Sequence, residues 1–170
     1  MVEGHDGKGW RGQADLAEMK WRRGAWDDAA DDVRRAVGEL SGLTDIIGVA
    51  WYQLGEIQLR AGHLEAAEET FGTAHENGKM PIPGWAHLYL VRGDAQGAVE
   101  LLSDALQPGT LGPLARARLL PTWIDAQMAL GELQVAKEAV AELEETCKLT
   151  NSRAFDAATG RAKGVLALGD

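Results

Sequence analysis

A glycine recurs at a nearly constant interval along this chain of 170 residues. Five glycines each end an apolar segment and precede a segment that contains alanine: Gly24, Gly62, Gly93, Gly131 and Gly169. Subtracting successive positions gives intervals of 38, 31, 38 and 38 residues. Sequence periods of about 20–50 residues are typical of proteins built from stacked structural repeats. The glycine interval therefore predicts a repeat architecture.

The segments on either side of these glycines have the period of an α-helix. After Gly62, apolar residues at 64, 67, 71 and 74 fall at steps of three and four, which places them on one helix face. Glycine supplies the left-handed conformation that commonly ends a helix. Each unit is therefore predicted to be helix, tight turn, helix. We expect first helices at 11–23, 46–61, 82–92, 114–130 and 153–168, and second helices at 25–40, 64–77, 95–106 and 133–148.

Composition and charge exclude several classes of protein. Asp and Glu number 26 against 17 Lys and Arg, a formal net charge of −9 that disfavours direct contact with nucleic acid. The sequence has no apolar run near the roughly 20 residues that cross a bilayer. Cys147 is the single cysteine, so an internal disulfide is impossible and a reducing cytoplasm is the natural setting.

The second unit carries a recognisable repeat motif. Its pattern Trp51-x-x-Leu54-Gly55, followed by Ala67-x-x-x-Phe71, resembles the tetratricopeptide repeat (TPR), although Gln58 stands where that family has tyrosine. The resemblance implies an all-α, right-handed TPR-like solenoid of about four and a half repeats over residues 10–170, after a flexible leader at 1–9. Pro121, inside the helix expected at 114–130, either kinks that helix or begins it.

A narrower resemblance covers residues 52–71, 81–94 and 114–145. These stretches look like the helical-repeat region of large bacterial LuxR-type transcriptional regulators, in which a DNA-binding helix-turn-helix domain follows the array. That likeness implies a fragment of a longer regulator, or a relative without its effector domain, that senses a signal or binds a partner. A stand-alone TPR adaptor for protein–protein interaction, with no role in transcription, is the alternative.

The TPR resemblance also implies where a partner binds. The first helices of a TPR array line a concave groove, and in this register eight residues face it: Glu18, Trp21, Tyr52, Glu56, His87, Arg118, Asp125 and Met128. Their mixture of aromatic, acidic and basic groups suits a protein partner, a peptide or a small effector. The family's lysine and asparagine clamp for terminal carboxylates is not supplied at these positions.

The remaining chemistry gives no sign of an enzyme. The four histidines are widely spaced in the sequence and none forms the i, i+4 pair of a helical zinc site, so we expect no metal, no cofactor and no catalytic group. Cys147 is predicted to be a small buried residue. Four tryptophans occupy positions that pack between helices and are predicted to be core: Trp26, Trp51, Trp85 and Trp123. The apolar face of the last helix, which includes Leu166, is expected to lack a cover and to favour a homodimer.

Overall fold

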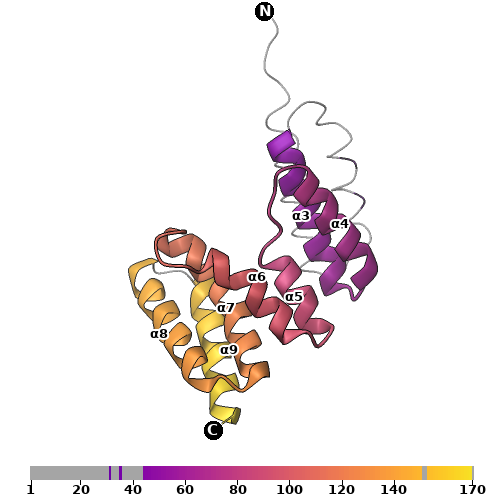
Figure 1. The fold of residues 1–170 in the computed structure, drawn as a ribbon. Coiled ribbons are helices and arrows are strands. Elements are labelled where there is room, and N and C mark those ends of the chain that lie inside the picture. The colour runs from indigo at the N-terminus through magenta and orange to yellow at the C-terminus, as the bar shows by residue number, and fades with distance from the viewer. Residues whose placement is uncertain (1–30, 32–34, 36–43, 151–152, 170) are drawn as a thin grey trace, which may run out of the picture. The chain divides into compact units, whose positions relative to one another are not determined.

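The computed structural model describes residues 31, 35, 44–150 and 153–169. Within these ranges the chain forms helices and no strand (Figure 1). The helices are α3 (Thr44–Arg60), α4 (Leu64–Glu76), α5 (Gly84–Val91), α6 (Ala95–Ala105), α7 (Pro113–Leu130), α8 (Leu133–Thr150) and α9 (Arg153–Gly169). The predicted all-α fold of paired helices is confirmed. The leader expected at 1–9 and the helices expected at 11–23 and 25–40 lie outside the described residues.

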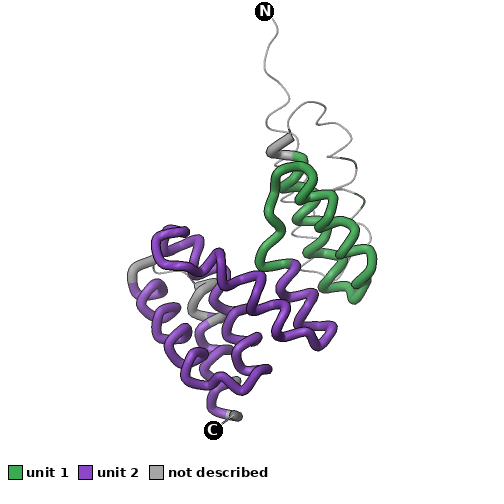
Figure 2. The backbone as a smooth tube through the Cα atoms, in the orientation of Figure 1, with its two compact units in different colours: residues 1–84 green, residues 85–170 purple. Residues whose placement is uncertain are grey.

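The chain divides into two compact units, Met1–Gly84 and Trp85–Asp170 (Figure 2). In the first unit α3 packs along α4, and the two helices lie side by side in Figure 1. In the second unit α7 packs against α6, α8 and α9. Since α7 and α9 are the first helices of successive repeats, their contact is the one by which repeats stack.

Three of the predicted turn glycines end helices in the same way. Gly62, Gly93 and Gly131 have φ angles of 84°, 82° and 80°, in the left-handed region. At Gly62 the glycine N–H donates to the Leu59 carbonyl at 3.1 Å, and the next N–H, of His63, donates to the Gln58 carbonyl at 2.9 Å. The same pair of hydrogen bonds occurs at Gly93 and at Gly131. This is the Schellman arrangement, which satisfies the carbonyls at a helix end and explains why glycine marks each turn.

Prolines set the start of two helices. The helix expected at 82–92 begins at Gly84, because Pro81 and Pro83 have no N–H and a residue before proline disfavours the helical conformation. Helix α7 begins at Pro113, where a missing N–H costs nothing, and continues through Pro121. The possibility that Pro121 begins the helix is therefore wrong.

The core of the first unit depends on close contact between α3 and α4. Phe71 on α4 is fully buried, and Leu54 on α3 is 1% exposed. A Cβ added to Gly55 would lie 2.4 Å from Cε1 of Phe71, and one added to Gly84 would lie 2.6 Å from its Cζ. Glycine at 55 and 84 therefore makes room for the aromatic ring.

The core of the second unit is built from small and aliphatic side chains. Ala98, Ala117, Ile124, Ala136 and Leu143 are all fully buried. Alanine at these positions lets neighbouring helices approach closely, and the larger Ile124 and Leu143 fill the space between them.

Two expectations about burial need correction. Trp51, Trp85 and Trp123 are half-buried rather than fully enclosed in the core, and Trp26 lies outside the described residues. Leu166, expected to lack a cover, is only 8% exposed within the chain itself. Its side chain is therefore already packed within the repeat.

Candidate functional site

The predicted groove residues fall on three of the described helices. Tyr52 and Glu56 lie on α3, His87 lies on α5, and Arg118, Asp125 and Met128 lie on α7. Glu18 and Trp21 lie outside the described residues. Tyr52 and Glu56 belong to the first unit and the other four to the second, so the two groups are described separately.

Tyr52 and Glu56 lie one helical turn apart and contact each other. The Tyr52 hydroxyl donates to Oε1 of Glu56 at 3.4 Å, and Arg60 Nη1 lies 2.6 Å from the second carboxylate oxygen. The Tyr52 ring lies 5.8 Å from the ring of Phe71, centroid to centroid, and Lys79 Nζ is 5.3 Å from the Tyr52 centroid. Both residues are half-buried, and the Tyr52 ring, through its contact with Phe71, joins α3 to α4.

The surroundings of Tyr52 also change its acidity. Burial raises the pKa of the Tyr52 hydroxyl well above its ordinary value of 10.0, and the negative charge of Glu56 and the hydrogen bond to it raise it further. The Arg60 charge and the Gly84 backbone act in the opposite direction with smaller effect. Tyr52 therefore remains a neutral hydrogen-bond donor well into alkaline solution.

In the second unit, Asp125 connects the two stacked first helices. Its carboxylate oxygens accept hydrogen bonds from Arg161 on α9, at 3.0 Å from Nη1 and 2.8 Å from Nη2. Such a two-point contact fixes the orientation of a guanidinium more firmly than a single bond does. Arg161 was not among the predicted groove residues, because nothing in the local sequence marks a partner 36 positions away.

Three further predicted groove residues, His87, Arg118 and Met128, belong to the same unit. Arg118 and Asp125 are seven positions apart on α7, about two helical turns, and so lie on the same side of the helix. Arg118 and His87 are exposed, and Met128 is half-buried. We call Arg118, Asp125, Met128 and Arg161 the α7–α9 surface. It combines two cations, one carboxylate and one flexible apolar side chain.

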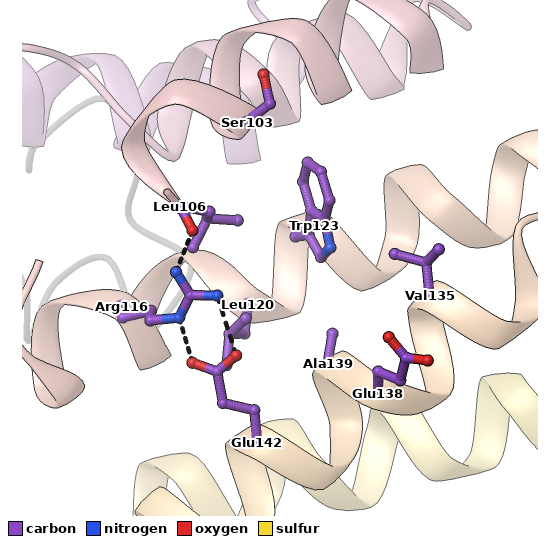
Figure 3. A pocket seen from close by; sticks show the side chains of 9 residues that line it. All are labelled: Ser103, Leu106, Arg116, Leu120, Trp123, Val135, Glu138, Ala139 and Glu142. Atoms are coloured by element: carbon purple, nitrogen blue, oxygen red, sulfur yellow. Dashed lines mark hydrogen bonds and ion pairs between the residues drawn. The ribbon is translucent and has the colours of Figure 1, made fainter. Parts of the chain in front are cut away.

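The opposite side of α7 borders a hollow of about 270 Å³ that the sequence did not predict. Nine residues from α6, α7, α8 and the position directly after α6 line it, as Figure 3 shows: Ser103, Leu106, Arg116, Leu120, Trp123, Val135, Glu138, Ala139 and Glu142. Arg116 contacts the Glu142 carboxylate through Nε and, at 3.1 Å, through Nη2. Its remaining terminal nitrogen donates to the Leu106 carbonyl. The helical register alone assigned Trp123 to the core, so no local signal pointed to this hollow.

A second, shallower hollow of about 350 Å³ lies between α8 and α9. Cys147 borders it and is buried, as predicted, with its Sγ 3.2 Å from the hydroxyl of Thr159. Lys163 on α9 forms an ion pair with Glu144 on α8. These contacts join the last two helices.

No group of three or more His, Cys, Asp or Glu side chains able to hold a metal ion occurs among the described residues. In the same part of the chain, no helix has the length and apolar character needed to cross a membrane.

Comparisons with known proteins bear on the fold. No protein-family model and no curated protein matches the sequence. Two solved structures of a putative kinesin light chain from Podosopora anserina, one of them a substituted variant, are similar to this chain and contain nearly identical TPR-like repeats. Each aligns with a TM-score of 0.62 at 19% sequence identity, over 98% of this chain and 90% of the other. The chain therefore has a TPR-like helical-repeat fold.

Proposed function

We propose that this chain is a non-catalytic interaction domain that binds a protein or peptide partner on the α7–α9 surface. The observation that carries the proposal is the Asp125–Arg161 pair, which joins two successive first helices on the same side of α7 as the exposed Arg118. In a TPR-like fold the first helices face the groove, so a partner there meets side chains from two repeats at once.

The chemistry of this surface favours a partner segment that carries a carboxylate. Arg118 and Arg161 supply two guanidinium groups, and only one of them is paired with Asp125. Guanidinium groups bind carboxylates through two parallel hydrogen bonds. Met128 adds a flexible apolar contact, a property common at surfaces that accept varied partners. A peptide or partner helix with acidic and apolar residues fits this combination. The alternative is a small acidic effector, which would contact a smaller part of the surface.

The wider context proposed for this domain is the regulatory region of a cytoplasmic LuxR-type transcriptional regulator. The support is the sequence resemblance over residues 52–71, 81–94 and 114–145. Partner binding would then favour one of two arrangements of an attached DNA-binding domain. This requires the partner to bind the two arrangements with different affinities. The alternative is a stand-alone adaptor. A reading frame that encodes a helix-turn-helix domain after this segment supports the regulator, and one that encodes none supports the adaptor.

A homodimer through the last repeat is a separate proposal. Packing between α8 and α9 leaves the exposed side chains of α9 available to a second copy, and sedimentation equilibrium tests this. A concentration-dependent mass approaching twice 18.2 kDa supports the dimer, and a constant single-chain mass at all concentrations rejects it.

Site-specific photo-crosslinking tests the binding surface. A photoreactive amino acid replaces Ala129, an exposed residue on the same side of α7 as Arg118, in one protein and Lys137, an exposed cation on the second helix α8, in a control. Each is irradiated in an extract of the source cells, and the products are identified by mass spectrometry. We expect a discrete crosslinked partner from position 129 that is absent from position 137. Equal products from both positions would contradict the proposal.

A further inference from the structure

The hollow between α6, α7 and α8 plays no part in the proposed function. Its volume of about 270 Å³ lies just below the roughly 300–1,000 Å³ typical of sites for small molecules. It is therefore better matched to a single long side chain than to a cofactor. It also opens on a different side of α7 from the groove, because Trp123 and Asp125 are two positions, or about 200°, apart around the helix.

The charges that line this hollow are unequal. Arg116 is the single cation among the nine lining residues, and its three nitrogens are occupied by Glu142 and by the Leu106 carbonyl. Glu138 is a second carboxylate and is exposed. Among the described residues its carboxylate contacts an uncharged group, since Oε1 accepts a hydrogen bond from Gln134 Nε2 at 3.0 Å. The lining thus has one negative charge in excess, located at Glu138.

An aromatic face accompanies that charge. Trp123 on α7 is half-buried, and Figure 3 shows its indole across the hollow from the Glu138 carboxylate on α8. Tryptophan is the most favourable aromatic partner for a cation, and arginine is the cation most often found over it. A planar guanidinium can stack on an indole and donate hydrogen bonds to a carboxylate at its edge at the same time.

We propose that this hollow binds an arginine side chain of a partner protein, with the guanidinium over Trp123 and donating to Glu138. The hollow already accommodates one guanidinium in its wall, that of Arg116 against Glu142. Charge complementarity selects the occupant, because the excess charge is negative and the aromatic face favours a cation. This contact is independent of the α7–α9 surface and gives the domain a second point of recognition.

The test uses the full chain with ¹⁵N-labelled tryptophan and a simple probe, N-acetyl-arginine amide. Loss of one indole N–H signal in Trp123→Phe assigns that signal to Trp123. We expect a saturable shift of it with the arginine probe at low salt, and none with N-acetyl-citrulline amide, which has the same shape without the charge. Glu138→Gln should weaken binding at least threefold. Glu145→Gln, an exposed carboxylate on α8 outside the hollow, should leave the affinity unchanged.

Three results would overturn the proposal: equal shifts with citrulline, unchanged affinity in Glu138→Gln, or no shift with arginine up to its solubility limit. The Glu138→Gln comparison stands even where Trp123→Phe fails to fold. Arg118→Glu separates this proposal from the proposed function. That variant changes the α7–α9 surface and should bind the arginine probe as the unaltered chain does.

Discussion

Gly55 on α3 faces the ring of Phe71 on α4 so closely that any side chain at 55 would overlap it. A Cβ there would lie 2.4 Å from Cε1 and 2.5 Å from Cδ1 of Phe71, far inside van der Waals contact. The Phe71 ring is fully buried, and its centroid lies 5.8 Å from that of Tyr52, three positions before Gly55 on α3. The glycine of the Trp-x-x-Leu-Gly motif is thus required by packing between the two helices of a repeat.

Gly55→Ala should therefore destabilise the protein. In an exposed helix, alanine is more stable than glycine by about 0.5–1 kcal/mol. Here the overlap with Phe71 should exceed that gain and lower the free energy of unfolding by about 1–3 kcal/mol, the usual cost of overpacking. Urea unfolding monitored by helical circular dichroism measures the change.

Gly72→Ala is the matched control for that substitution. Gly72 lies inside α4, one position after Phe71, and a Cβ there would meet nothing within 4 Å. The control should be stabilised by about 0.5–1 kcal/mol. If both variants are stabilised alike, the close contact at Gly55 does not constrain the fold.

A substitution of Gln58 should raise the free energy of unfolding, whereas Gly55→Ala should lower it. Its side chain is 6% exposed, and its Oε1 has no hydrogen-bond partner in the described part of the chain. An unsatisfied buried polar group costs about 1–3 kcal/mol, so Gln58→Met, which keeps the length of the side chain, should raise the free energy of unfolding by about 1 kcal/mol. A clear loss of stability in urea unfolding would show instead that the amide makes a favourable contact.

Tyr52 makes stability depend on alkaline pH. Its pKa is raised in the folded protein above the ordinary value of 10.0, so above pH 10 the unfolded chain releases this proton while the folded chain retains it. The neutral hydroxyl therefore makes its full contribution to the free energy of unfolding below pH 10, and this contribution decreases as the pH rises above 10. Tyr52→Phe should therefore lose less stability than the unaltered protein between pH 9 and pH 11.5. Parallel urea midpoints over that range would contradict this assignment.

Asp125→Asn should separate binding from stability. Arg161 is half-exposed, with 52% of its side chain accessible, and ion pairs of this kind contribute about 0–1 kcal/mol. The urea midpoint should therefore change little. Affinity for the crosslinked partner should decrease, because Arg161 loses the carboxylate that orients it. A large loss of stability would mean that the pair is mainly a structural link between α7 and α9.

Most of the helical pattern was predictable because local chemistry determines it. Glycines at 62, 93 and 131 end helices by the same two hydrogen bonds, so their interval revealed the repeat directly. The predicted and observed bounds of α4, at 64–77 and Leu64–Glu76, differ at one end by one residue. The predicted start at 82 lies two positions before the observed start of α5 at Gly84, because Pro83 has no N–H and disfavours the helical conformation of Ile82.

The candidate sites were less predictable because they depend on contacts between distant residues. The helical register placed Tyr52 and Glu56 on one face, but not the contact of Tyr52 with Lys79 and Phe71 on the following segment. Likewise, Arg116 and Glu142 meet across 26 positions. Trp123 was assigned to the core by its register, whereas the packing of α6 leaves it half-buried beside a hollow.

The most direct test of the central claim is the affinity of the partner that crosslinks at position 129, measured by titration calorimetry against three proteins. These are the unaltered chain, Arg118→Glu, and Lys137→Glu, which makes the same change of net charge on α8. If the α7–α9 surface binds the partner, Arg118→Glu weakens binding at least tenfold while Lys137→Glu stays within twofold of the unaltered chain. Equal affinities for Arg118→Glu and the unaltered chain would contradict the claim.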